Sequence, residues 1–324
     1  MQFRRVAASL TALLLVAGAS SLAQAQEKKK ERKLSKQEQQ DAQALLKLVD
    51  AGTAVAELPL TWEQHHFVKA ADGKTFIPFT VKADTKSELS LYVRAIAKGA
   101  APAKDKKVEY PWDDIQFLPN GPDGRFSRAL SVAPGEYDLF VAVKEKSTGK
   151  KGEVTKTTVL KRDLSVPDFT QPELKTSSII LATNVEAAQP LDMDGQRANP
   201  YTFAGMKVTP SLDAKFKKAG ELSLVFWIYG VAPTSMQKPD VQVEYSFSKK
   251  DGADWKYFNK TAPQMLNGST FPPEFSLAVG HLVTGSLSIP LSSFEPADYK
   301  LEIKVTDKVS GKSVTENVQF NVGA

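Results

Sequence analysis

The stretch PGEYDLFVAVKEKSTGK at residues 134–150 returns as PADYKLEIKVTDKVSGK at residues 296–312. The two copies align without a gap, 162 residues apart, and the alignment pairs Tyr137 with Tyr299. A repeated segment of this kind marks a repeated structural unit. The sequence therefore predicts two copies of one domain, which also agrees with a length of 324 residues.

The repeated stretch alternates between apolar and polar residues, as a strand with one buried face does. The residues expected to face the two cores are Tyr137, Leu139, Val141 and Val143, and Tyr299, Leu301, Ile303 and Val305. A tyrosine at the start of such a strand resembles the tyrosine corner of immunoglobulin-like sandwiches, where the hydroxyl bonds to nearby backbone. Gly149 and Gly311 then permit the turn into a last strand.

Short alternating segments separated by Gly, Pro, Asn and Asp predict an all-β fold. We expect two immunoglobulin-like antiparallel β-sandwiches in tandem, preceded by a signal peptide and a short α-helix. The predicted parts are a signal peptide (1–25), a charged segment with a short helix (26–54), sandwich 1 (55–166), a linker (167–175) and sandwich 2 with an insertion (176–324).

A second repeated string, ELSL, occurs at residues 88–91 and 221–224. From its glutamate to the corner tyrosine the chain runs 49 residues in the first copy and 78 in the second. If the two strings are equivalent strands, the second copy carries 29 extra residues between these strands.

The N-terminus has the features of an export signal. Arg4 and Arg5 precede a long apolar run, and a small-x-small site predicts cleavage after Ala25. We expect a periplasmic or secreted protein with no transmembrane span after cleavage. The chain has no cysteine, so its cores must be stable without disulfides. Cleavage leaves 40 Lys and Arg against 37 Asp and Glu, a balance that gives no reason to expect nucleic acid as a partner.

A helix is predicted after the charged segment. Ser35 and Glu38 have the spacing of a capping box. The residues on one face of that helix are Ala42, Leu45, Leu46 and Val49. This stripe favours a helix docked on the first domain, and the alternative is docking on a partner or a membrane.

The residues that could carry chemistry are few. His65 and His66 are adjacent and would point to opposite faces of a strand, and His281 is distant, so we expect no metal site. The string LDMDGQ resembles part of a calcium loop through Asp192 and Asp194, although a turn is favoured. No cofactor is expected.

The sequence favours a protein that is not an enzyme. It contains no nucleophile elbow, phosphate loop or dinucleotide fingerprint. Asp113 and Asp114 are adjacent, and this neither supports nor excludes glycosidase chemistry.

Several aromatic residues are candidates for binding. Trp112 and Trp255 lie near turn signals, where each could stack on a sugar, anchor a protein partner or pack on its own sheet. The face of the second ELSL strand opposite to its core face carries Val225, Trp227 and Tyr229. So apolar a face requires a cover: the extra residues of the second copy, which are the simplest candidate, the first domain or a partner.

The two closing strands resemble the closing hairpin of bacterial extracellular immunoglobulin-like or fibronectin type III-like domains. The join SVPDF…LKTSSIILA, at residues 165–182, is similar to the C-terminal region of exported acidobacterial proteins that carry von Willebrand-related or GWxTD domains. The GWxTD string and a metal-ion adhesion motif are both missing here, so the resemblance implies a fold and an envelope setting.

The sequence therefore predicts a non-enzymatic exported binding or structural module of the bacterial cell envelope. Its expected partner is an envelope or extracellular protein. The alternative is a carbohydrate-binding accessory protein that uses exposed tryptophans to bind a polysaccharide.

Overall fold

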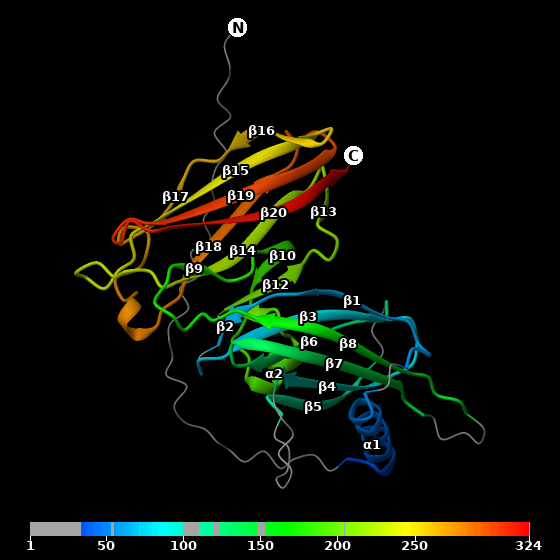
Figure 1. Ribbon diagram of the computed structural model, residues 1–324. Coiled ribbons are helices and arrows are strands. Elements are labelled where there is room, and N and C mark those ends of the chain that lie inside the picture. Colours follow the sequence, from blue (N-terminus) through cyan, green and yellow to red (C-terminus); the bar gives the residue numbers. More distant parts are fainter. Residues whose placement is uncertain are drawn as a thin grey trace. The chain divides into compact units, whose positions relative to one another are not determined.

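The structure is a computed structural model, and it describes residues 34–52, 55–70, 72–99, 110–119, 123–147, 153–203 and 205–323, apart from the side chains of residues 193 and 194. The chain divides into two compact units with the border between Thr170 and Gln171. We call them the first and second sandwich (Figure 1). The predicted signal peptide lies outside the described residues.

The first sandwich has two antiparallel sheets of four strands each. One sheet contains β1 (Leu60–His65), β2 (Val68–Lys69), β3 (Thr75–Ala83) and β6 (Arg125–Val132), with β3 paired to all of the others. The other sheet has the order β5 (Trp112–Leu118), β4 (Leu89–Ala97), β7 (Gly135–Glu145) and β8 (Thr157–Val166).

The second sandwich has two sheets of six strands each. The first sheet is β11 (Thr202–Phe203), β12 (Met206–Pro210), β10 (Ile180–Ala187), β14 (Glu221–Tyr229) and β18 (Val283–Pro290), with β9 (Lys175–Thr176) also paired to β14. The second sheet is β13 (Lys215–Lys217), β20 (Ser313–Gly323), β19 (Ala297–Asp307), β15 (Val241–Asp251) and β16 (Asp254–Lys260), with β17 (Gln264–Leu266) also paired to β15. Only the short β13–β20 pairing is described as parallel.

Seven strands follow each other in the same order in both sandwiches. The equivalent pairs are β1 and β10, β3 and β14, β4 and β15, β5 and β16, β6 and β18, β7 and β19, and β8 and β20. In each unit the first, second and fifth of these strands form one sheet, and the others form the second sheet. This division is typical of immunoglobulin-like sandwiches. The predicted all-β fold of two such sandwiches in tandem, with a short helix ahead of them, is confirmed.

The equivalence predicted from the ELSL string is wrong. β4, which carries the first string, pairs with the corner strand β7, whereas β14, which carries the second, lies in the other sheet from β19. β15 is the strand that pairs with β19. Glu145 lies eight residues after Tyr137 and is paired with Leu89 of β4. Asp307 lies eight residues after Tyr299 and is paired with Val241 of β15, so β4 and β15 have the same register against their corner strands. A four-residue alternating string fits any strand with one buried face, so it does not specify the sheet.

The extra residues of the second copy therefore lie elsewhere. Residues 188–220 join β10 to β14, where the first sandwich uses only residues 66–74 between β1 and β3. Residues 261–282 join β16 to β18, where the first sandwich uses residues 119–124. The predicted block of 29 residues between the ELSL strand and the corner tyrosine is replaced by these two longer connections.

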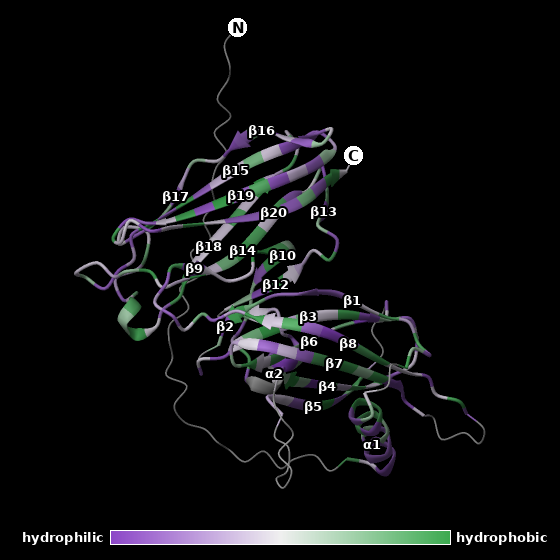
Figure 2. Cartoon of the chain, viewed as in Figure 1, coloured by the Kyte–Doolittle hydropathy of each residue, from purple (hydrophilic) through white to green (hydrophobic). Residues whose placement is uncertain are grey.

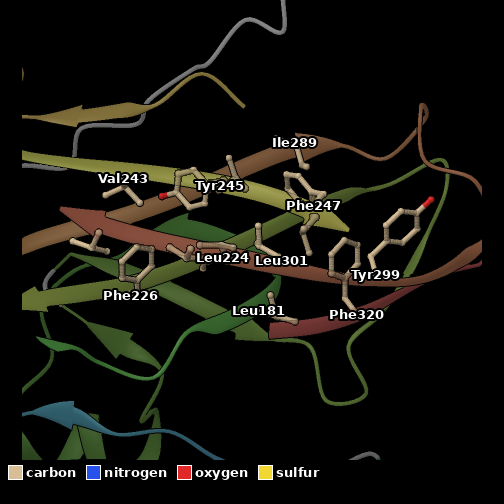
Figure 3. Close-up of a cluster of buried hydrophobic side chains, with 14 of the residues drawn as sticks. Leu181, Leu224, Phe226, Val243, Tyr245, Phe247, Ile289, Tyr299, Leu301 and Phe320 are labelled. Carbon is tan, nitrogen blue, oxygen red and sulfur yellow. The ribbon is translucent and has the colours of Figure 1, made fainter. Parts of the chain in front are cut away.

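The inward residues of the corner strands form the cores. Leu139, Val141 and Val143 of β7 are fully buried against Ile77 and Phe79 of β3. Full burial of one such side chain stabilises the fold by about 2 kcal/mol. In the second sandwich the buried side chains of β14, β15 and β19 meet in the same way (Figure 3).

Each corner tyrosine bonds to the backbone carbonyl of the residue four positions before it. The hydroxyl of Tyr137 donates to the carbonyl oxygen of Ala133 at 2.8 Å, and that of Tyr299 donates to the carbonyl of Glu295 at 2.9 Å. These are the hydrogen bonds of a tyrosine corner. Gly311 has φ +73°, a conformation that favours glycine, in the turn between β19 and β20. Gly149 lies outside the described residues.

Helix α1 (Lys36–Asp50) covers the outer face of β4 and β7 in the first sandwich. It begins with the predicted capping box between Ser35 and Glu38. Leu45 and Val49 pack against Tyr92, Phe140 and Ala142 on the sheet. The structure therefore shows α1 docked on the first sandwich, as its apolar stripe favoured.

A buried ion pair accompanies this apolar contact. Lys144 of β7 donates to the Oδ1 atom of Asp41 at 2.6 Å, and the Ser90 hydroxyl donates to Oδ2 at 3.3 Å. The side chain of Asp41 is 2% exposed and that of Lys144 is 14% exposed. Removing one partner of such a pair leaves an uncompensated buried charge, so the pair fixes the position of α1.

Candidate binding surfaces

The five residues predicted to bind lie in three different environments. Trp112 is half-buried on β5 and packs against the core of the first sandwich. Val225, Trp227 and Tyr229 are at most 5% exposed. Trp255 lies on β16 and is half-exposed. The structure does not bring these side chains together in one site.

The aromatic face of β14 has a cover within the chain. The ring of Trp227 lies 4.8 Å from that of Phe203 on β11, measured between centroids. The backbone N–H of Trp227 donates to the hydroxyl of Ser177, and the carbonyl of Trp227 accepts from the N–H of Ser177. Phe203 belongs to the longer connection at residues 188–220, so this cover comes from extra residues of the second copy, but from the connection before β14 and not from the stretch between the ELSL string and the corner tyrosine where the sequence analysis placed them. Because the face is buried, an external partner has no access to it.

The histidines of the first sandwich are neutral near pH 7. Burial, together with the positive charge of Arg162, lowers the pKa of His65 to about 4. Burial, together with His65, lowers the pKa of His66 to about 4. The Nδ1 atom of His65 accepts a hydrogen bond from the indole N–H of Trp62 at 3.3 Å, so this nitrogen is already occupied.

Within the described residues, no three His, Cys, Asp or Glu side chains are grouped so that they could hold a metal ion. Asp192 caps the short helix α2 (Met193–Ala198), where its Oδ1 atom accepts from the N–H of Gly195 at 2.7 Å. The side chain of Asp194 lies outside the description.

Asp113 and Asp114 point to different networks. Asp113 accepts a hydrogen bond from the hydroxyl of Tyr92 and lies 3.7 Å from the Nε atom of Arg94. Burial and the Asp113 hydrogen bond raise the pKa of Tyr92. Asp114 instead accepts from the amide of Gln116 at 2.6 Å. Both carboxylates thus serve contacts within the first sandwich.

A surface that the sequence did not indicate lies at one end of the second sandwich. Three connections meet there: residues 230–240 between β14 and β15, residues 261–282 between β16 and β18, and residues 308–312 between β19 and β20. We call this surface the loop end. Its large exposed apolar side chains are Met236 (72% exposed), Val279 (62%), Leu282 (44%) and Val309 (43%).

Hydrogen bonds join the first two of these connections. The ammonium group of Lys238 donates to the carbonyl oxygens of Pro272 and Pro273, both at 2.7 Å. The N–H of Leu277, in the 3-10 helix η1 (Leu277–Val279), donates to the carbonyl of Gln237 at 2.9 Å. Because Met236 precedes Gln237, these bonds hold Met236 and η1 in the same part of the surface. The residues of η1 are apolar, as Figure 2 shows.

The buried carboxylate of Asp307 joins the third connection to the first. It accepts from the N–H groups of Ala232 and Val309, both at 3.0 Å, and from the hydroxyl of Ser310 at 2.5 Å. The N–H of Lys308 donates to the carbonyl of Asp240 at 2.8 Å. Val309 is therefore exposed on a turn whose conformation is stabilised by hydrogen bonds to the buried carboxylate of Asp307.

An aromatic group supports the longest of the three connections. The rings of Phe271 and Phe275 stack with centroids 4.1 Å apart, and His281 lies 5.2 Å from Phe275. The Nδ1 atom of His281 accepts from the N–H of Ser276 at 2.9 Å. The loop end thus has apolar side chains on its outer side, and the aromatic group beneath it is continuous with the core of the second sandwich.

The comparisons with known proteins assign no family to this chain. No family model matches the chain, and no curated protein matches it. Among solved structures, trypsin-activated alpha-2-macroglobulin from Escherichia coli aligns with 84% of this chain at 10% identity and a TM-score of 0.24. The chain spans 17% of that macroglobulin chain, and at this TM-score the likeness supports no statement about either fold or function. The class that the structure defines is a tandem immunoglobulin-like β-sandwich protein.

In the part of the chain that the structure describes, every helix is too short or too polar to span a bilayer.

Proposed function

We propose that this chain is a non-enzymatic binding module of the bacterial cell envelope that engages a protein partner through the loop end of the second sandwich. The observation that carries the proposal is the set of four exposed apolar side chains on three hydrogen-bonded connections. A contiguous exposed apolar patch marks a protein interaction site, and we infer that these four side chains contribute to one such patch. Loops on a rigid scaffold are where binding residues concentrate.

The order of the loop end favours specific recognition. Binding costs less when the loops already have their bound conformation. Gly230, at the start of the first connection, has φ +67°, and a Cβ atom there would lie 2.0 Å from the carbonyl oxygen of Glu173. The chain can turn in this way only with glycine, so the sequence of this connection is suited to one conformation.

Two features of the sequence support the envelope setting. The N-terminal residues have the pattern of an export signal. The join at residues 165–182 is similar to exported acidobacterial proteins with von Willebrand-related or GWxTD domains. On these grounds we propose a periplasmic or secreted location and an envelope or extracellular protein as the partner.

Site-specific photo-crosslinking tests this function. A photoreactive amino acid replaces Met236, Val279 or, as a matched control, Val154, which is 87% exposed in the first sandwich. We expect one protein adduct shared by positions 236 and 279 and missing at position 154. The adduct is then identified and purified, and its affinity for the chain is measured.

The double variant Met236→Ser with Val279→Ser should weaken that affinity at least tenfold, because truncating central apolar contacts typically costs more than about 1 kcal/mol each. Val154→Ser should leave the affinity unchanged. Equal adducts at positions 154 and 236, or an affinity that the double variant does not change, would contradict the proposal.

A further inference from the structure

The second sandwich has an open polar sheet face, separate from its loop end. The face belongs to β16, β15, β19 and β20, on the side away from the core. Its exposed residues on β19 and β20 are Asp298, Glu302, Lys304, Ser313, Thr315, Asn317 and Gln319. Polar and apolar residues alternate along β15 and β19, as the colours of Figure 2 show. We call this surface the outer face.

Two aromatic side chains lie together at one edge of the outer face. Trp255 and Tyr257 of β16 pair with Lys250 and Ser248 of the neighbouring strand β15. Because Lys250 and Ser248 lie on the side of β15 away from the core, both rings point away from the core as well. Tyr257 is 67% exposed. Residues two apart on a strand share a face and lie about 7 Å from each other. The pair therefore forms a short aromatic platform in line with the strand.

Charged groups of both signs surround this platform. The ammonium group of Lys300 lies 5.8 Å from the centroid of the Trp255 ring. Lys250 lies 4.0 Å from the carboxylate of Asp298. On the outward side of β15 and β19 the lysines are Lys250, Lys300 and Lys304, and the acids are Glu244, Asp298 and Glu302. These six charges cancel, and Lys260 of β16, which pairs with outward Ser246, leaves four lysines against three acids, a formal sum of +1. A face of mixed sign with so small a sum favours neither a polyanion nor a polycation.

A comparison with the equivalent face of the first sandwich indicates that the outer face does not suit an apolar helix. There, Phe140 and Ala142 lie beneath the apolar side of α1. The positions 162 residues later are Glu302 and Lys304, both exposed. An apolar helix of the α1 type would remove these charges from water without a partner, which is costly. The outer face suits a ligand that has many hydroxyl groups and flat apolar patches.

We propose that Trp255 and Tyr257 form a binding site for a neutral polysaccharide. A pyranose ring has C–H groups on its faces that stack on aromatic rings, and hydroxyls around its edge. Those hydroxyls can donate to Asp298 and Glu302 and accept from Lys250 and Lys300. An extended glycan chain lies along the strand direction and contacts both rings. This site uses different residues from the loop end and does not depend on the proposed protein partner.

Affinity electrophoresis tests the inference with named probes. The full-length mature chain is run in native gels that contain a soluble β-1,4-glucan, xylan, amylose or, as the charged probe, polygalacturonate. We expect retardation by at least one of the three neutral polysaccharides. Trp255→Ala and Tyr257→Ala should each raise the dissociation constant for that polysaccharide at least fivefold.

Two controls keep the result specific. Met236→Ser, on the loop end, should leave the glycan affinity unchanged, and Tyr257→Phe, which retains the ring, should keep most of it. Far-ultraviolet circular dichroism confirms that each variant is folded. Retardation by none of the neutral probes, retardation by polygalacturonate alone, or alanine variants that bind the polysaccharide as tightly as the unsubstituted chain would overturn the site.

Discussion

The two sandwiches share their strand order but differ in what covers equivalent sheets. On the first, β7 presents Phe140 and Ala142 outward, and α1 covers them. On the second, β19 presents Glu302 and Lys304 at the corresponding positions, and both are exposed. The inward residues of the two strands are alike, so the scaffold is conserved between the copies while the outward residues determine the cover. The first sandwich uses this sheet for its own stability, and the second leaves it accessible.

The ion pair under α1 gives the largest expected effect. Asp41→Ala leaves Lys144 largely buried without its partner, so we expect a loss of about 3 kcal/mol in the stability of the first sandwich. Hydrogen exchange read by mass spectrometry reports each sandwich separately. Adding Lys144→Met should restore most of the loss. A change below 1 kcal/mol for Asp41→Ala would show that α1 is not held by this pair.

The outward positions of β7 and β19 offer a matched comparison. Phe140→Ala removes a buried ring from beneath α1 and should destabilise the first sandwich by a similar amount, about 3 kcal/mol. Glu302→Ala, at the equivalent exposed position, should change the second sandwich by less than about 0.5 kcal/mol. Chemical denaturation followed by hydrogen exchange measures both. Similar losses in the two sandwiches would mean that the second face is covered as well.

The stability of the first sandwich should depend on pH through His65 and His66. His65 and His66 have pKa values of about 4 when folded, below the ordinary value of 6.5. Between pH 6.5 and about 4 the unfolded chain therefore binds protons that the folded chain does not. Stability falls as the pH falls through this window, by at most about 1.4 kcal/mol per pH unit for each histidine.

The measurement is the hydrogen-exchange stability of the first sandwich at pH 6.5 and pH 5.5. Replacing both histidines with glutamine should flatten the decline. A decline of the same slope in that double variant would assign the pH dependence to other groups.

Substitution of the two corner tyrosines should cause a small loss of stability, of similar size in the two sandwiches. Tyr137→Phe and Tyr299→Phe each remove one hydroxyl that donates to a backbone carbonyl. We expect about 1 kcal/mol in the sandwich that carries the substitution. A loss confined to one of the two copies would indicate that the corners are not equivalent.

The sequence predicted the parts of the fold that depend on periodicity. The inward residues of β7 and β19 follow from a spacing of two residues, whereas the capping box at Ser35 and the apolar stripe of α1 follow from spacings of three and four. The ELSL string failed because short alternating strings occur on strands of either sheet. Only the pairing register, which joins residues far apart in the chain, distinguishes β14 from β15.

The candidate surfaces were harder to predict for a different reason. Trp227 lies on a strand that is buried on both faces, and its cover, Phe203, comes from a connection whose path no local pattern specifies. Met236 and Val279 are single apolar residues in irregular segments, and a sequence alone does not show that their loops meet. Trp255 was identified from the sequence, whereas its neighbour Tyr257 became evident only from the register of β16.

Hydroxyl-radical footprinting in intact cell envelopes tests the central claim most directly, namely that the second sandwich is the binding half of the molecule. The oxidation of Met236 is compared between the purified chain and the chain in the envelope, with Val154 as the exposed reference in the first sandwich. The account predicts strong protection of Met236 in the envelope and unchanged labelling of Val154. Equal oxidation of Met236 in both settings would contradict it.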